Sequence, residues 1–244
     1  MDLNQLKEYL NNLANNLENG DRKFLKNRLE SLSSVFPFSE YEYMLMFFRD
    51  RGIITFCDYE ILRNSYINSN KNLQLYGLAP RIFGQIWGEQ HIISLDNRFK
   101  KPDKTLDPEF NNQYDLWIEG IKLEVKASRA INTKKRGSIL SKAISYNSNE
   151  PFWMNFQQLK PNFCNAFIFI GVWIDKIVYW VLLSEEVREN KHFSHQHTGG
   201  IEYQIGITNK NINEFDIYKV DGTQMADIII QKYKFKDKLR NAPA

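Results

Sequence analysis

The sequence predicts an α/β fold in which a mixed central β-sheet is flanked by helices and carries a helical N-terminal extension. Apolar residues in the first third recur every three or four positions, which is the period of an amphipathic helix. From Gln113 onward they alternate with polar residues, as in half-buried strands. The 244 residues, 43% hydrophobic, suffice for one large domain or for a core with a smaller helical attachment.

The N-terminal region, residues 1–78, is predicted to be helical. A stripe of leucines indicates a first helix, which either packs within the chain or forms a dimer contact. A second helix follows. Ser39 is expected to cap a third, which runs to about Arg51, and a fourth begins near Asp58. The leucines of the stripe are Leu3, Leu6, Leu10, Leu13 and Leu17.

The remaining residues, 79–244, are predicted to form the core. The order of elements favours a mixed sheet with helices packed on it. Helices are expected at about 79–90, 151–160 and 184–190, and strands at 114–118, 121–126, 167–174, 176–182 and 201–208.

The most informative segment is residues 114–126, which read as a β-hairpin. If Glu119 and Gly120 form a two-residue loop, Asp115 lies directly opposite Glu124. One face of the hairpin is then wholly apolar, and a slip of one residue would bury charges, so the hydrophobic pattern itself supports this register. The other face carries Asp115, Trp117, Lys122, Glu124 and Lys126.

Two carboxylates placed across a strand pair lie about 4.5–5.5 Å apart at Cβ and repel each other. A divalent cation between Asp115 and Glu124 reverses the sign of that interaction, and Mg²⁺ prefers such oxygen ligands. Lys126 shares the face of Glu124, so its ammonium can reach whatever the metal binds. This combination favours metal-assisted hydrolysis of a phosphodiester.

Asp115, eight further residues and then Glu124-Val125-Lys126 resemble the signature of the PD-(D/E)XK nuclease superfamily, which includes many type II restriction endonucleases. Tyr114 stands where that signature often has proline, a position that varies in the family. The resemblance covers roughly residues 80–208.

This resemblance implies roles for individual residues. Asp115, Glu124 and the backbone carbonyl of Val125 would bind Mg²⁺, and Lys126 would be the catalytic lysine. Because the family often adds an acidic residue from the preceding helix, Glu89 is a further candidate metal ligand.

The resemblance also implies an activity and partners. We expect site-specific cleavage of double-stranded DNA by a homodimer, and a cognate DNA methyltransferase acting on the same site. Two alternatives remain open: a repair or junction nuclease with the same core, and a non-enzymatic DNA-binding regulator that uses the N-terminal helices, with the acidic pair merely structural.

Basic residues follow the predicted active strand directly. The net charge of +3 says little by itself, but residues 121–142 hold seven basic residues against one acidic residue. The polar, histidine-containing stretch 191–200 is interpreted as a second DNA-contacting loop. The predicted DNA contacts are Arg129, Lys134, Lys135, Arg136, His195 and Gln196.

The sequence suggests a cytoplasmic protein with no membrane partner. Cys57 and Cys164 form no CxxC pair and are interpreted as two buried thiols in a reducing compartment. The N-terminal residues are polar and lack the hydrophobic region of a signal peptide. The most apolar run, 166–174, is too short to span a bilayer.

Overall fold

A computed structural model describes residues 3–31, 37–195 and 202–240. It is a mixed α/β structure, which confirms the predicted class. The chain divides into two compact units. The first unit comprises Met1–Gly77, Asn132–Glu150 and Trp173–Lys176, and the second comprises Leu78–Ile131, Pro151–Val172 and Ile177–Ala244. Two later segments of the chain thus group with the N-terminal helices.

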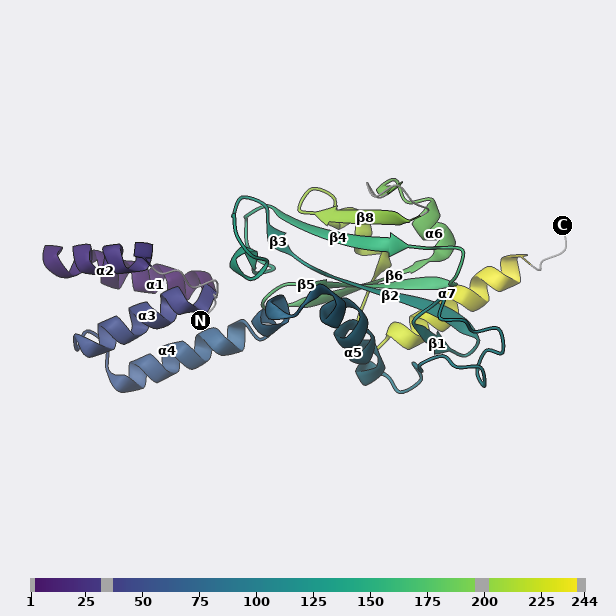
Figure 1. Ribbon diagram of the computed structural model, residues 1–244, viewed down its shortest axis with the longest axis horizontal. Coiled ribbons are helices and arrows are strands. Elements are labelled where there is room, and N and C mark those ends of the chain that lie inside the picture. The colour runs from purple at the N-terminus through teal and green to yellow at the C-terminus, as the bar shows by residue number, and fades with distance from the viewer. Residues whose placement is uncertain (1–2, 32–36, 196–201, 241–244) are drawn as a thin grey trace. The chain divides into compact units, whose positions relative to one another are not determined.

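The first unit is built from helices (Figure 1). Leu6, Leu10 and Leu17 are buried, so these positions of the leucine stripe pack within the chain rather than offering a dimer contact. Its elements are α1 (Leu3–Asn15), α2 (Asn19–Ser31), α3 (Pro37–Asp50), α4 (Phe56–Ser69) and the 3₁₀ helices η1 (Leu73–Gly77) and η3 (Leu140–Lys142).

The helix cap predicted at Ser39 is wrong. Helix α3 begins at Pro37, whose fixed φ suits the first turn of a helix, and Ser39 therefore lies inside that turn. A capping box occurs instead before α4, where the Thr55 hydroxyl accepts the Asp58 N–H at 3.1 Å and the Asp58 carboxylate accepts the Thr55 N–H at 3.0 Å. The fourth helix consequently begins at Phe56, two residues before the predicted start.

The second unit contains a five-stranded mixed sheet in the order β1-β2-β5-β6-β9. Strands β2 and β5 are parallel, and the other neighbours in this sheet are antiparallel. The strands are β1 (Leu116–Ile118), β2 (Ile121–Arg129), β5 (Ala166–Val172), β6 (Ile177–Leu183) and β9 (Lys219–Val220).

A second sheet has the order β3-β4-β8-β7. Phe156 of β4 stacks on Phe169 of β5 at 4.4 Å between ring centroids and meets the edge of Trp180 of β6, so β4 covers one face of the five-stranded sheet. The strands are β3 (Ile131–Asn132), β4 (Phe152–Leu159), β8 (Tyr203–Thr208) and β7 (Phe193–His195).

Helices cover the opposite face of the five-stranded sheet. Figure 1 shows β4 on one side of strands β2 and β5, and helix α5 on the other side. The first residue of α5, Gly88, lies so close to the sheet that an added Cβ would stand 3.4 Å from the Cβ of Ala127. The helices of this unit are the π-helical η2 (Ile82–Trp87), α5 (Gly88–Leu95), α6 (Ser184–Arg188), the 3₁₀ helix η4 (Ile212–Tyr218) and α7 (Met225–Arg240).

The helix predicted at 151–160 is wrong, because this segment forms strand β4. Phe152, Met154 and Phe156 are buried while Trp153 is exposed, which is the two-residue period of a strand. Beyond Phe156 the register shifts, and Gln158 adopts a φ of +58°. The shift interrupts the alternation, and this irregularity hides the strand period from a reading of the sequence.

The hairpin predicted at 114–126 has the expected register. Leu116 lies opposite Leu123, and Ile118 lies opposite Ile121. Glu119 and Gly120 have φ values of +44° and +85°, as in the hairpin turns whose twist matches that of the flanking strands. The apolar face of this hairpin is buried, as the alternation requires.

Two further observations concern membrane-spanning helices and the exposure of the two cysteines. In the part of the chain that the structure describes, no helix combines the length and apolar character needed to cross a membrane. Cys164 is buried as predicted, but Cys57 is exposed, so the interpretation of two buried thiols is wrong for Cys57.

Candidate active site

Asp115 is fixed against strand β2 by its backbone and by its carboxylate. Its N–H donates to the carbonyl of Leu123 at 2.9 Å, and its Oδ2 accepts the N–H of Val125 at 2.8 Å. Just before the first residue of β1, the Asp115 carboxylate thus accepts the Val125 N–H in place of a backbone carbonyl. Because the N–H and C=O of a strand residue point to the same side, the Val125 carbonyl is also directed toward the Asp115 side of β2.

Glu124 and Lys126 lie on one face of β2 because they are two residues apart on a strand. Lys126 Nζ is 2.7 Å from Glu124 Oε1, and the two side chains are only 19% and 13% exposed. The predicted face of the hairpin therefore forms a largely buried ion pair beside Asp115.

The pKa values of the Asp115 and Glu124 carboxyl groups are both raised, mainly by burial. The pKa of Glu124 is raised to about 7, because burial and the nearby charge of Asp115 outweigh the opposing effect of Lys126. The pKa of Asp115 is also raised by burial, against the hydrogen bond from Val125 and the charge of Lys126. Two adjacent carboxylates in this setting are costly to ionise together, and a cation relieves that cost.

A second ion pair, between Glu89 of α5 and Lys101, adjoins this pair of carboxyl groups. Glu89 is buried, whereas Lys101 is half-exposed. The segment holding Lys101 is anchored by its neighbour Lys100, whose N–H and carbonyl both bond to Trp117 of β1 at 2.9 Å. The Lys101 ammonium also interacts with the Asp115 charge, so this lysine interacts with two of the predicted metal ligands.

Lys101 is the residue of the site that the sequence did not reveal. It lies in Lys100-Lys101-Pro102, a segment without apolar periodicity and remote from the hairpin in sequence. The single backbone pairing of Lys100 with Trp117 brings it to the site, and no pattern in the sequence predicts that pairing.

The donor set fits a hard divalent cation. The Asp115 and Glu124 carboxylates and the Val125 carbonyl supply oxygen atoms, which Mg²⁺ prefers, and the raised pKa values mark a place where positive charge is favourable. Among the described residues, however, no three His, Cys, Asp or Glu side chains form a ready-made metal cluster. Glu89 is paired with Lys101 and does not join the other two acids in one cluster.

The structure separates the predicted DNA-contacting residues. Arg129 is buried in the second unit, where its guanidinium donates to the Leu78 carbonyl at 2.8 Å and lies 4.0 Å from the centroid of the Phe83 ring. This packing does not favour the predicted phosphate contact. Three exposed residues of the first unit remain available for DNA: Lys134, which also pairs with Glu150, Lys135 and Arg136.

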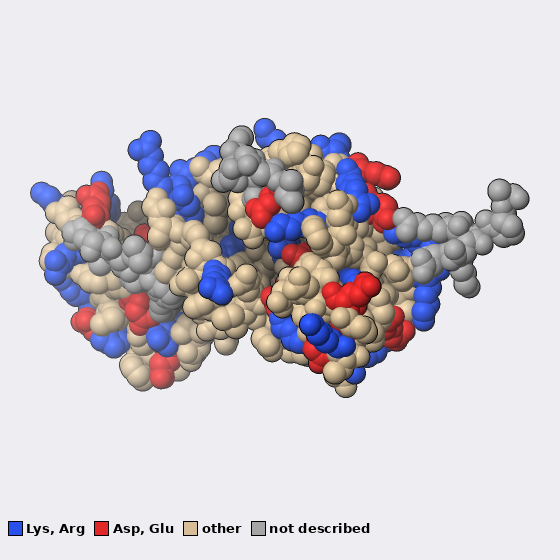
Figure 2. All heavy atoms as spheres, turned by 45° about the vertical axis from the view of Figure 1, so that its right-hand side comes forward, with Lys and Arg blue, Asp and Glu red and all other residues tan. Residues whose placement is uncertain are grey.

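The second predicted DNA-contacting segment is only partly described. His195 ends strand β7, is exposed and packs its ring 4.4 Å from that of Tyr203. Gln196 lies outside the described residues. On the face shown in Figure 2, basic and acidic side chains are interspersed. Charge alone therefore does not define a DNA-binding surface there.

The sequence matches no protein-family model, and a search of curated proteins gave no match. The residues of the site and the resemblance of their spacing are therefore what supports a function for this protein.

Proposed function

We propose that this protein is a Mg²⁺-dependent endonuclease that cleaves double-stranded DNA at specific sites, in the manner of type II restriction enzymes. The observation that carries the proposal is the buried pair of carboxyl groups, Asp115 just before β1 and Glu124 on β2, with Lys126 Nζ 2.7 Å from Glu124. An acidic pair that is only structural gains little from burial, because the single Lys126 ammonium cannot fully compensate two ionised carboxylates for their lost hydration.

Asp115, Glu124 and the Val125 carbonyl would hold Mg²⁺, with Glu89 as a further ligand if it leaves Lys101. When bound, the metal supplies Lewis acidity that activates water and stabilises charge on the phosphate. The hydrogen bond from Val125 keeps the Asp115 carboxylate oriented before any ligand arrives. The site is thereby preorganised, which lowers the cost of binding.

Lys126 is the group best placed to act on the reacting atoms. Glu124 holds its ammonium beside the carboxylates, where Nζ can donate a hydrogen bond to a phosphate oxygen or to the attacking water. Low exposure strengthens such a bond, because little bulk water competes for the same donor. Lys126 thus stabilises negative charge that develops during cleavage.

The proposal carries partners with it. One centre attacks one strand, so cutting both strands at one site is simplest for a homodimer with two-fold symmetry acting on a palindromic target. A host that contains such an enzyme needs a DNA methyltransferase that protects the same sequence. The endonuclease and the methyltransferase act on the same DNA, so we place both in the cytoplasm.

Incubation of plasmid DNA with the protein and Mg²⁺ tests the proposal. Discrete fragments that disappear when the metal is chelated support a site-specific endonuclease. A smear indicates a nonspecific nuclease, and cleavage confined to branched or damaged DNA indicates a repair or junction nuclease. DNA that is bound but stays intact at every Mg²⁺ concentration contradicts the proposal and favours a DNA-binding regulator.

A further inference from the structure

The ion pair between Glu89 and Lys101 joins a buried side chain to a half-exposed one. The Glu89 side chain is 9% exposed, whereas that of Lys101 is 50% exposed. Glu89 lies in the first turn of α5, and its neighbour Gly88 packs closely against Ala127 of β2. The helix therefore fixes the carboxylate, while the flexible four-carbon stem of the lysine allows its ammonium to leave.

The backbone that carries Lys101 is also fixed. The N–H and the carbonyl of Lys100 both bond to Trp117 at 2.9 Å, and Phe99 before it is buried. Pro102 follows, and its ring restricts the backbone further. A change of partner by Lys101 therefore needs only rotation about side-chain bonds, which is fast for an exposed residue.

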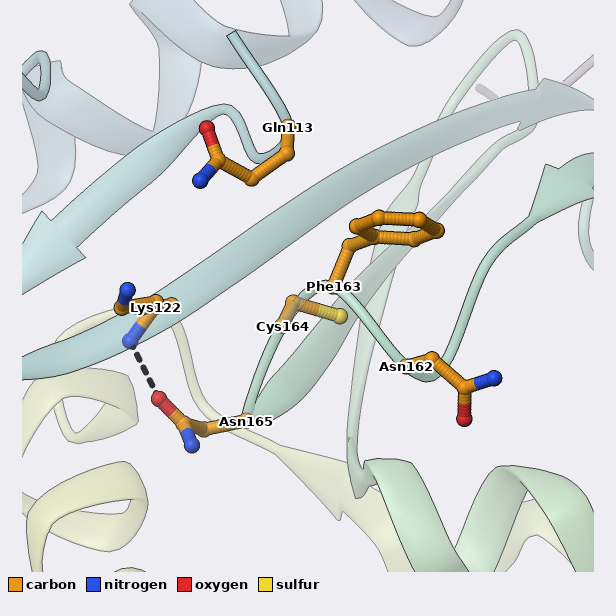
Figure 3. A pocket seen from close by; sticks show the side chains of 6 residues that line it. All are labelled: Gln113, Lys122, Asn162, Phe163, Cys164 and Asn165. Atoms are coloured by element: carbon orange, nitrogen blue, oxygen red, sulfur yellow. Dashed lines mark hydrogen bonds between the residues drawn. The ribbon is translucent and has the colours of Figure 1, made fainter. Parts of the chain in front are cut away.

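Strand β2 is held on both of its edges at the position of Glu124. On the edge that faces β1, the Asp115 carboxylate accepts the Val125 N–H at 2.8 Å. On the other edge, the Asn165 Oδ1 accepts the Lys122 N–H and the Asn165 N–H donates to the Lys122 carbonyl, both at 2.7 Å (Figure 3). The backbone that positions the two carboxyl groups is thus fixed.

The Lys101 ammonium serves two carboxylates at once. It pairs with Glu89 and interacts with the charge of Asp115. A cation bound to Asp115 would repel this ammonium, yet departure of the ammonium alone would leave Glu89 buried and unpaired, which is costly. The cost disappears if Glu89 passes to the cation and the ammonium meets another anion nearby.

A phosphate of the DNA substrate is such an anion. Oxygen ligands lie about 2.0–2.1 Å from Mg²⁺, so a phosphate oxygen that shares the cation with Asp115 stands within about 4 Å of that carboxylate. The Lys101 charge already interacts with Asp115, so its ammonium can reach this oxygen by rotation of the side chain. A lysine ammonium binds phosphate as a point charge, without the fixed geometry that an arginine requires.

We propose that Lys101 changes partner when DNA binds: its ammonium passes from Glu89 to a phosphate oxygen of the substrate, and the Glu89 carboxylate becomes available to the cation. The inference rests on the proposed nuclease function and adds to it a substrate-binding residue that regulates the metal centre. DNA and the cation then bind cooperatively, whereas in the absence of DNA Lys101 opposes the cation. The metal centre is thereby completed only when substrate is present.

The affinity for duplex DNA, measured by fluorescence anisotropy with and without Ca²⁺ at constant ionic strength, tests this inference. Ca²⁺ also takes oxygen ligands and replaces Mg²⁺ so that the duplex stays intact. The probe is a duplex with the sequence cut in the plasmid, or a mixed-sequence duplex if none is cut. The ratio of the two affinities is the coupling factor, which by reciprocity is also the factor by which DNA tightens Ca²⁺ binding.

The coupling factor of Lys101→Met should be lower than that of the parent by about fivefold or more, within the usual range of such couplings. A lysine that stays on Glu89 would shift both affinities alike and leave the ratio unchanged. Lys101→Arg keeps the charge and should keep the coupling. Lys100→Met, which alters the exposed neighbour, is the matched control and should behave as the parent does.

The double variant Glu89→Gln/Lys101→Met guards against a folding defect. Loss of Lys101 alone leaves a buried carboxylate unpaired, whereas the double variant removes both charges of the pair. It should lose the coupling to a similar extent as Lys101→Met.

Two results overturn the inference. One is a parental coupling factor in both Lys101→Met and the double variant, and this leaves the nuclease proposal intact if the parent cuts plasmid DNA in Mg²⁺. The other is a parent that binds no DNA or whose DNA affinity does not rise with Ca²⁺. A parent that shows coupling through Lys101 but never cleaves in Mg²⁺ contradicts the nuclease proposal, while the change of partner stands on the variants.

Discussion

The ammonium nitrogen of Lys126 lies 2.7 Å from Oε1 of Glu124, and both side chains are largely buried. Two residues of one strand reach this arrangement without any long-range contact, because alternation places them on the same face. The fold adds Asp115, which directly precedes the neighbouring strand β1 and accepts the Val125 N–H through its carboxylate.

Replacing Lys126 with alanine should abolish cleavage but leave the metal ligands in place. Loss of a buried donor to a developing charge typically costs about 100- to 1,000-fold in rate. Single-turnover cleavage gives the rate, and calorimetric titration with Mg²⁺ at pH 8 gives the metal affinity. Lys234→Ala, an exposed lysine that pairs with Glu119, is the control. Parental cleavage by Lys126→Ala would assign this lysine to a structural ion pair.

Replacing Lys101 with methionine should tighten Mg²⁺ binding. The Lys101 ammonium pairs with Glu89 and interacts with Asp115, so it competes with the metal for the same negative charge. For a half-exposed lysine we expect an effect of about fivefold in the dissociation constant, corresponding to roughly 1 kcal/mol.

Lys100→Met is the matched control for this measurement. Lys100 is the exposed neighbour of Lys101, and its backbone pairing with Trp117 does not depend on its side chain. Equal dissociation constants for the parent and for Lys101→Met would show that Lys101 does not compete with the metal.

Replacing Glu124 with glutamine should stabilise the metal-free protein at pH 8. Because the folded-state pKa of about 7 lies above the ordinary glutamate pKa of 4.5, the free energy of unfolding falls as pH rises through this window. Glutamine removes the charge, so the variant gains relative to the parent by at most roughly 3 kcal/mol. Urea unfolding at pH 5 and pH 8 measures the difference, which should grow with pH.

The control for Glu124→Gln is a substitution of a glutamate whose side chain is exposed to solvent. Glu119→Gln, in the turn of the same hairpin, keeps Glu124 and should therefore unfold with the same pH dependence as the parent. If the advantage of Glu124→Gln is the same at both pH values, the Glu124 pKa is not raised in the folded protein.

Neutralising Lys134, Lys135 and Arg136 together should weaken binding to every DNA sequence and flatten its salt dependence. Each lost phosphate contact removes about 0.9 from the slope of log affinity against log salt, so a triple variant should lose between two and three. Fluorescence anisotropy at several salt concentrations gives the slope. An unchanged slope would mean that these exposed residues do not meet the DNA backbone.

The sequence predicted the hairpin and the face that carries Asp115, Glu124 and Lys126, because one register alone buries all of its apolar residues. Leu116 opposite Leu123 confirms that register. Strand β4 could not be predicted, since a bulge near Gln158 breaks its alternation. Lys101 reaches the site through an isolated backbone bridge, and Arg129 is buried by packing on Phe83. Long-range contacts of this kind leave no periodic signal in the chain.

Cleavage and binding measured together on Asp115→Asn and Glu124→Ala test the central claim most directly. Asparagine can still accept the Val125 N–H, so the first variant removes charge while keeping the local structure. With Mg²⁺, the parent and Glu119→Gln should cut plasmid DNA, whereas both site variants should fail to cut yet bind the same DNA at least as tightly in metal-free buffer. Near-parental cleavage by either site variant would contradict the assignment of Asp115 and Glu124 as the metal-binding centre of a nuclease.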